Sequence, residues 1–429
     1  MLRDIILQNK AERDEYLSKP FISREDVSLP SKLFESKLIK VITGARRTGK
    51  SVFCFLLLKG RKFGYLNFDD TELLQIKDTD EIIKTLHEIY PEAEYYFFDE
   101  IQNLPGWELF VNKLQRRGYN LILTGSNSKL LSGELASSLT GRYIPVEIMP
   151  FSFKECLLAA GLDSGKEKMS LPEHRGMIQL ALENYLTEGG YPEVVVNKVA
   201  ADKYLETLFD AILLKDIVKR YRIRKHDNLM ELAYYLMSNV CSEYSFTGIQ
   251  ENFGFKSKTT VQKYMRYLED VYLMFGLNRF SYKVKEQVNT KKKLYILDNG
   301  FVKAKAFKFS PDKGHLLENA VFVELMRRGY EPNKDLFYHK NADNTEIDFV
   351  VRENRKISCL YQCVYDVTGL GVKNREEKSL IKASNELDCK DLIILTRDYD
   401  AIKKVEGKTI NYVSFLIWLL SPNNSRPYS

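Results

Sequence analysis

The sequence has no run of about 18 uncharged apolar residues, the length that a membrane-spanning helix requires. Its first residues, Met1-Leu2-Arg3-Asp4, do not have the profile of a signal peptide. The six cysteines and five histidines show neither metal-site nor disulfide-framework spacing. No repeat or low-complexity segment occurs, apart from a polar tail over 422–429. These absences predict a cytoplasmic protein with reduced thiols and no membrane partner.

The composition is that of a globular protein. The chain has 429 residues, of which 44% are hydrophobic and 12% aromatic. This is enough apolar material to pack the cores of two or three domains.

A glycine-rich motif, G-x-x-x-x-G-K-S, lies between an apolar strand predicted over 39–43 and an apolar helix predicted over 51–59. This arrangement is typical of loops that bind nucleotide phosphates. The glycines let backbone N–H groups face the phosphates, Lys50 reaches the β and γ oxygens, and Ser51 ligates Mg²⁺. A chance glycine-rich turn would not need the strand and the helix that flank it. The predicted nucleotide-binding residues are Gly44, Ala45, Arg46, Arg47, Thr48, Gly49, Lys50, Ser51 and Val52.

A second acidic motif completes such a site. The apolar run over 95–98 ends in Asp99 and Glu100. Asp99 is predicted to hold Mg²⁺ together with Ser51, and Glu100 to act as the catalytic base that polarises the attacking water. The alternative is an ordinary acidic strand end before a turn. The Asp-Glu pair favours hydrolysis of ATP over phosphoryl transfer to a small molecule, so a small-molecule kinase is disfavoured.

Three further residues are candidates for contact with the γ-phosphate. Ser126 and Asn127 follow a strand predicted over 120–124 and are sensor candidates, although polar residues there are also ordinary turn formers. Arg142, at the start of the last strand of this region, is a candidate arginine finger, acting in cis or from a neighbouring subunit. A surface or ion-paired arginine is the alternative.

Strands and helices alternate between residues 38 and 148, and this pattern predicts an α/β fold with a five-stranded parallel P-loop sheet. In such a sheet the ligand lies at the carboxyl ends of the strands. The predicted strands are 39–43, 63–68, 95–98, 120–124 and 143–148. The expected domains are 1–150 (N-terminal helix and ATPase), 151–228 (helical connector), 229–312 (winged helix-turn-helix), 313–421 (mixed α/β) and 422–429 (tail).

Residues 246–268 read as helix, glycine turn and helix, followed by two strands around a basic loop. Basic residues are concentrated nearby: residues 198–309 contain 21 Lys and Arg against 12 Asp and Glu, net +9, although the whole chain is only +6. This local excess suits a partner rich in phosphate. A protein-packing module and a solvated basic face are the alternatives. The DNA-binding candidates are Lys256, Lys258, Gln262, Lys263 and Arg266.

Several of these segments carry a family resemblance. ITGARRTGKS, YYFFDEIQN, LILTGSNSKLL and LTGRYIPVEIMPFSFKE resemble AAA+-type ATPases of bacteria and archaea that carry a C-terminal domain of unknown function. EGGYPEVV, LLKDIVKRYRIR, LLENAVFVELMRRG and NTEIDFVV resemble the C-terminal half of that family. The resemblance implies ATP and Mg²⁺ as cofactors. It also admits a homo-oligomer, because AAA+-type enzymes commonly form rings in which a neighbour's arginine completes the site.

The C-terminal part is expected to resemble a restriction-endonuclease core, in which carboxylates bind Mg²⁺. Glu318 and Asp348 match two of its acids, but Gln362-Cys363-Val364 stands where Glu-x-Lys would be required. A degenerate domain with nuclease activity unlikely is therefore predicted.

The sequence as a whole favours a Mg²⁺-dependent ATPase that couples nucleotide turnover to DNA binding by its C-terminal half. The alternative function is a nucleotide-dependent switch or scaffold that binds a protein partner without DNA.

Overall fold

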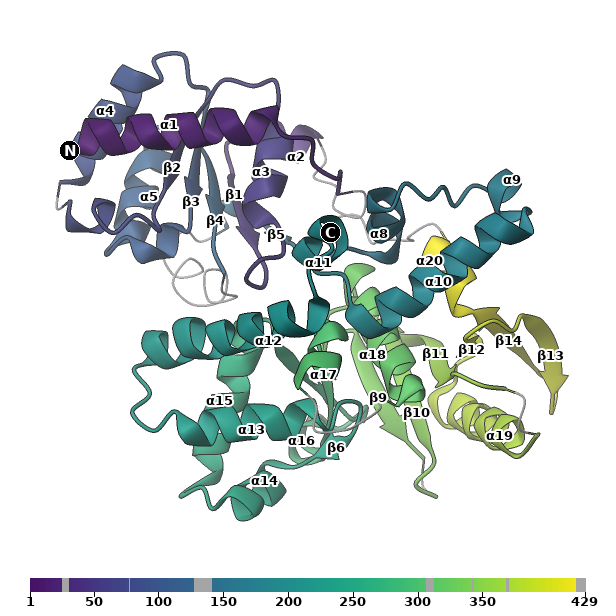
Figure 1. The fold of residues 1–429 in the computed structure, drawn as a ribbon. Helices are drawn as coiled ribbons and strands as arrows, with labels where there is room; N and C mark the ends of the chain where they lie inside the picture. Colours follow the sequence, from purple (N-terminus) through teal and green to yellow (C-terminus); the bar gives the residue numbers. More distant parts are fainter. Residues whose placement is uncertain are drawn as a thin grey trace. The chain divides into compact units, whose positions relative to one another are not determined.

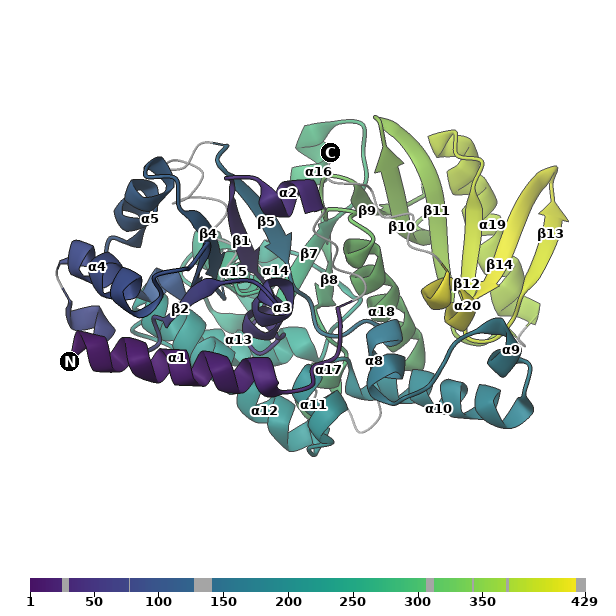
Figure 2. The ribbon, with the colours of Figure 1, turned by 90° about the horizontal axis from the view of Figure 1, so that it is seen from above.

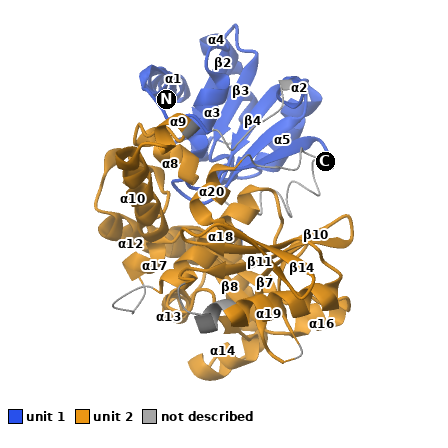
Figure 3. Ribbon diagram, turned by 90° about the vertical axis from the view of Figure 1, so that its right-hand side faces the viewer, with its two compact units in different colours: residues 1–150, 270–272 blue, residues 151–269, 273–429 orange. Residues whose placement is uncertain are grey.

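The computed structural model describes residues 1–24, 31–76, 78–126, 141–305, 312–341, 343–367 and 370–421. The chain divides into two units (Figure 3). Unit 1 consists of residues 1–150 together with 270–272, and unit 2 of residues 151–269 and 273–429. The predicted polar tail over 422–429 and the sensor candidate Asn127 lie outside the described residues.

The sheet of unit 1 has five strands in the order β2-β3-β4-β1-β5 (Figure 1). All its strand pairs are parallel, which confirms the predicted fold class. The strands are β1 (Ile39–Thr43), β2 (Phe63–Asn67), β3 (Tyr95–Asp99), β4 (Asn120–Thr124) and β5 (Tyr143–Glu147). The helices are α1 (Leu2–Ser18), α2 (Ser31–Glu35), α3 (Lys50–Leu58), α4 (Thr79–Ile89) and α5 (Trp107–Arg116), with 3₁₀ turns η1 (Leu73–Gln75) and η2 (Ile101–Asn103).

Helices cover both faces of this sheet because the inner strands are apolar on both sides. All five residues of β1 and of β3 are buried, as expected for strands inside a parallel sheet. Helices α4 and α5 build the core on one face, and α3 builds the core on the other. Helix α1 runs along the edge strand β2, so that its first turns join one core and its last turns the other (Figure 2).

Unit 2 begins with helices, as predicted. They are α8 (Phe153–Ala159), α9 (Lys166–Met169), α10 (Pro172–Glu188), α11 (Pro192–Asn197) and α12 (Ala201–Ala211), followed by a π-helical segment, η3 (Ile212–Lys219). A capping box fixes the first of them: Ser152 accepts a hydrogen bond from the N–H of Glu155, whose carboxylate accepts one from the N–H of Ser152. A proline at the first turn starts α10.

The middle of unit 2 combines short helices with a three-stranded antiparallel sheet in the order β6-β8-β7. Its elements are α13 (Asp227–Met237), β6 (Glu243–Tyr244), α14 (Phe246–Phe253), α15 (Lys258–Asp270), β7 (Met274–Asn278), α16 (Val284–Asn289), β8 (Lys292–Ile296) and α17 (Gly300–Lys305). Gly254, with φ 63°, ends α14, and the hydroxyl of Ser257 accepts a hydrogen bond from the N–H of Thr260 at the start of α15.

The last part of unit 2 is a six-stranded mixed sheet in the order β13-β14-β12-β11-β10-β9, which confirms the predicted mixed α/β region. Helix α19 packs on one face of it. The elements are α18 (Lys313–Arg327), β9 (Leu336–Lys340), β10 (Glu346–Glu353), β11 (Lys356–Val364), α19 (Leu370–Leu387), β12 (Leu392–Thr396), β13 (Ala401–Val405), β14 (Lys408–Ser414) and α20 (Phe415–Leu420).

Within the described residues, no helix combines the length and the apolar character needed to cross a membrane. None of the six cysteines forms a disulfide bond.

Candidate nucleotide-binding site

The glycine-rich loop joins β1 to α3 at the carboxyl edge of the unit 1 sheet, and its backbone requires the residues that the motif specifies. Gly44 has φ 139°, and a Cβ atom there would lie 2.1 Å from the carbonyl oxygen of Ile148. Gly49 has φ 89° and precedes the first residue of α3. Arg47 also adopts the left-handed conformation, with φ 65°. Only glycine fits the first position, because both the backbone angle and the close approach exclude a side chain.

The side chains of the loop hold its carbonyl groups. The Lys50 ammonium group and the Thr48 hydroxyl group each donate a hydrogen bond of 2.9 Å to the carbonyl oxygen of Ala45. Lys50 is buried and is the first residue of α3, whose positive end faces the loop. A lysine and a helix N-terminus directed at one loop form a site for an anion such as a phosphate group.

Arg24 is a contact of this loop that the sequence analysis missed. Its guanidinium group is buried and donates hydrogen bonds to the carbonyl oxygens of Thr48, at 2.9 Å, and Met149, at 2.7 Å. It thereby ties the loop to the chain that follows β5. No motif in the sequence signals this contact, because the residues it joins are 24 and 125 positions away.

Asp99, the last residue of β3, contacts the first turn of α3. Its carboxylate accepts hydrogen bonds from the hydroxyl group of Ser51, at 3.0 Å, and from that of Thr124. Burial, and secondly the charge of Glu100, raise the pKa of Asp99 to about 6. Hydroxyl and carboxylate oxygens are the donors that Mg²⁺ accepts, so the residues present fit this ion.

Glu100 directly follows Asp99 and has the left-handed backbone angle φ 50°, which is uncommon for a residue other than glycine. Its N–H group donates a 2.9 Å hydrogen bond to the Thr124 hydroxyl group. Thr124, fully buried at the end of β4, therefore contacts both acidic residues. The side-chain amide of Gln102 donates a hydrogen bond to the Glu100 carboxylate. The sequence analysis had assigned no role to Thr124 or Gln102.

Of the three candidates for γ-phosphate contact, Ser126 and Arg142 lie in the described residues. Ser126 is buried just beyond β4, and the N–H of the intervening Gly125 donates to the carbonyl oxygen of Ile42 in β1. Arg142 lies at the opposite edge of the sheet, because it precedes β5 and its carbonyl oxygen accepts from the N–H of the first β1 residue. A five-residue strand, about 13 Å long, separates that edge from the loop. The prediction that Arg142 acts in cis is therefore wrong; a role toward a neighbouring subunit stays a prediction.

The predicted DNA-binding residues lie on the solvent side of α15 and of the turn before it. Lys256, Lys258, Gln262, Lys263 and Arg266 are all exposed. In the described part of the chain, no carboxylate lies within ion-pair distance of the four cationic side chains in this set. Elsewhere in unit 2, by contrast, Lys303, Lys305 and Lys340 each have an acidic partner.

The structure brings the three predicted residues of the nuclease-like site together. The side chain of Gln362 accepts a 3.3 Å hydrogen bond from the N–H of Asp348. The Lys293 ammonium group contacts Glu318, at 2.6 Å, and Asp348, at 3.0 Å, so Glu318 lies near the other two residues. Lys293 also contacts Glu346. A buried lysine thus stands among the carboxylates. In the residues that the structure describes, no group of three or more acidic, histidine or cysteine side chains is arranged to hold a metal ion.

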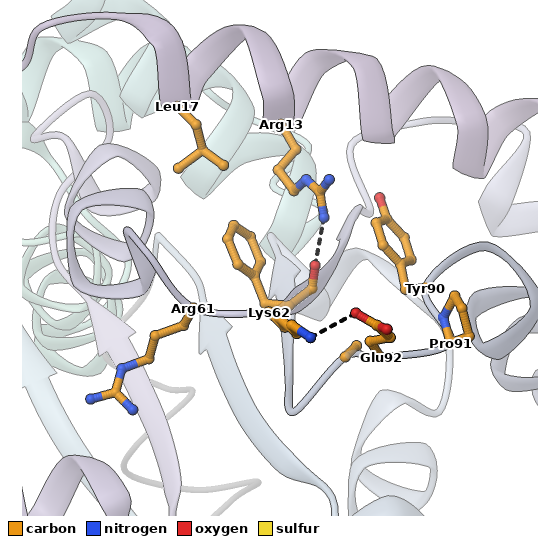
Figure 4. A pocket seen from close by; sticks show the side chains of 9 residues that line it. Arg13, Leu17, Arg61, Lys62, Tyr90, Pro91 and Glu92 are labelled. Atoms are coloured by element: carbon orange, nitrogen blue, oxygen red, sulfur yellow. Dashed lines mark hydrogen bonds and ion pairs between the residues drawn. The ribbon is translucent and has the colours of Figure 1, made fainter.

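A shallow cavity of about 360 Å³ lies elsewhere in unit 1, between the end of α1 and the start of β2 (Figure 4). Its cationic side chains are engaged: Arg13 donates to the carbonyl oxygen of Phe63, and Lys62 pairs with Glu92 at 2.7 Å. It is separate from the glycine-rich loop, and the sequence analysis had predicted no site there.

Comparison with known proteins identifies the family. A family model described as an AAA domain matches residues 36–157. Models described as domains of unknown function, DUF8612 and DUF4143, match residues 179–312 and 313–415. An uncharacterized protein of Methanocaldococcus jannaschii is 34% identical and covers 98% of this chain and 95% of its own length. The chain belongs to the family of this protein.

Members of this family include an uncharacterized protein of Haemophilus influenzae, 32% identical over 94% of this chain and 100% of its own length. A solved structure, the Walker-type ATPase of Pyrococcus abyssi, is 16% identical and covers 67% of this chain and 99% of its own, with a TM-score of 0.42. The match of residues 36–157 to the AAA-domain model confirms that part of the resemblance. The restriction-endonuclease-like part stays a prediction, because residues 313–415 match only a domain of unknown function.

Proposed function

We propose that this protein binds ATP with Mg²⁺ at the loop over 44–52 and hydrolyses it. The observation that carries the proposal is the 3.0 Å contact between Ser51 and Asp99 beside the loop that Lys50 closes. Ser51 and Asp99 would hold the Mg²⁺ ion, which neutralises charge on the phosphates when bound. Lys50 would exchange its contact with Ala45 for the phosphate oxygens, and Glu100 would accept a proton from the attacking water.

Replacing Lys50 tests the binding site. Lys50→Ala removes the cation nearest the predicted phosphates, so MgATP affinity is expected to fall about 10- to 100-fold, the equivalent of one hydrogen bond to a charged group. Isothermal titration calorimetry with MgATP measures this decrease, and phosphate release without an acceptor measures hydrolysis. Lys59→Ala is the matched control, because Lys59 is exposed just beyond the same helix. Equal affinities for MgATP in both variants would refute the proposed site.

A second function, DNA binding by unit 2, is favoured by the unpaired cations of α15. Tyr221, in a basic segment, stacks on Tyr267 of α15 with ring centroids 3.7 Å apart. The basic side chains of that segment therefore continue the cationic surface of α15; Arg222, Arg224 and Lys225 are exposed. A winged helix has two helices followed along the chain by a pair of strands. The same order occurs here, in α14, α15, β7 and β8. Unpaired lysine and arginine side chains on one surface suit a phosphate backbone.

The salt dependence of DNA affinity tests this function. Replacing Lys258, Lys263 and Arg266 by alanine is expected to flatten the plot of log K against log salt by about 0.9 for each DNA phosphate that the variant no longer neutralises. Fluorescence anisotropy with a labelled duplex at several salt concentrations provides the slopes. The control replaces Lys62, Lys168 and Lys334, which are exposed and ion-paired, and so removes the same charge. If neither variant differs from the native protein, the protein-binding switch becomes the better hypothesis.

A further inference from the structure

The side chain of Gln102, in the turn after β3, contacts Glu100, the predicted catalytic base. Residues 101–103 form the 3₁₀ turn η2, and the N–H of Asn103 donates to the carbonyl oxygen of Glu100 at 3.1 Å. Because Glu100 has a left-handed backbone, the chain reverses within this turn. The side chain of Gln102 consequently returns to the Glu100 carboxylate and donates a hydrogen bond to it from Nε2.

The other end of the same amide has no partner. Gln102 Oε1 is buried and accepts no hydrogen bond from the described residues. The orientation of the amide follows from its neighbour, because a carboxylate accepts hydrogen bonds and Nε2 is the only side-chain donor of glutamine. A buried acceptor without a hydrogen bond is unfavourable, so a donor is expected to reach it when the site functions.

We propose that Gln102 Oε1 and the Glu100 carboxylate together hold the water that attacks ATP, an inference that rests on the proposed function. The water donates one hydrogen bond to each acceptor, which directs its lone pair at the γ-phosphorus. As the new P–O bond forms, the bond between the γ-phosphorus and the oxygen bridging to the β-phosphate breaks, and ADP leaves. One water proton passes to Glu100 and later to solvent; the other stays on the phosphate product. Gln102 is thus a second residue that touches the reacting water.

The Gln102→Ala variant tests this role. The rate constant kcat is expected to fall at least about tenfold while KM for ATP is unchanged, because the water and not the nucleotide loses a partner. Affinity for ADP with aluminium fluoride, a complex that includes the attacking water, is expected to fall by the same factor, while affinity for ADP alone stays native. Gln75→Ala is the matched control, because Gln75 is an exposed glutamine on the other 3₁₀ turn of unit 1.

The outcomes separate this inference from the proposed function. If native protein neither binds MgATP nor releases phosphate, both fail. If native protein hydrolyses ATP and Gln102→Ala matches it within twofold, only the role of Gln102 is overturned. A parallel loss of ADP affinity in Gln102→Ala would also overturn it, since that result would indicate a structural role in the turn.

Discussion

Glu100→Gln is expected to lower the rate of ATP hydrolysis by about 10²- to 10⁴-fold, the range that a general base contributes. Glutamine keeps the length and shape of the side chain, so the left-handed backbone at φ 50° and the hydrogen bond from its N–H to Thr124 are expected to persist. The Ser51–Asp99 pair and Lys50 are untouched. MgATP should therefore bind with native affinity and remain uncleaved.

Two measurements check this expectation. Equilibrium titration with MgATP gives the affinity, and chromatography of the bound nucleotide shows whether ATP or ADP remains after incubation. Glu72→Gln is the control, because Glu72 is an exposed acid of the same unit. Hydrolysis by Glu100→Gln at the native rate would show that Glu100 is not the base.

Lys293→Met is expected to destabilise unit 2 by about 3–5 kcal/mol, the usual cost of removing one partner from a buried ion pair. Lys293 is buried among Glu318, Glu346 and Asp348. Burial lowers the pKa of Lys293, but the surrounding carboxylates raise it by more. The pKa therefore lies well above its ordinary value, and the ammonium group stays charged. Burial and the charge of Asp348 raise the pKa of Glu318 to about 8, because the acids outnumber the one cation.

Urea unfolding followed by tryptophan fluorescence measures this destabilisation, since Trp418 is buried in unit 2. The deficit is expected to shrink as the pH falls. Removing Lys293 removes an attraction that lowers the pKa of the buried Glu318, so this pKa rises further above its unfolded value and folding takes up a proton there. Lys291→Met is the control, because that neighbouring side chain is exposed. A destabilisation by Lys293→Met no larger than that of the control would contradict the buried ion cluster.

The geometry of the glycine-rich loop was largely predictable because its parts lie close together in the sequence. Gly44 and Gly49 are diagnostic through their spacing, and the apolar runs around them fix strand, loop and helix along a short stretch of chain. Asp99 could be placed as well, since parallel strands end at one edge of the sheet. The same argument, applied to the start of β5, would have excluded Arg142 in cis.

The remaining contacts could not be predicted because they join distant positions or depend on turn geometry. Lys293 meets Asp348 across 55 residues, and Arg24 meets Met149 across 125. In the sequence Lys293 is one of three consecutive lysines and carries no sign of burial. Gln102 is only two residues from Glu100, but the contact between their side chains depends on the left-handed backbone of Glu100. The residue type does not predict that conformation.

Unit 1 is not continuous in the chain, and this affects how the protein can be divided. The segment 270–272 belongs to it, and the hydroxyl group of Tyr272 donates a 3.1 Å hydrogen bond to Thr43 Oγ1, one residue before the glycine-rich loop. A fragment that stops at Pro150 would lack Tyr272, so Thr43 would lose this hydrogen bond. Expression of the ATPase part by simple truncation would consequently yield an incomplete domain, so experiments on nucleotide chemistry require the undivided polypeptide.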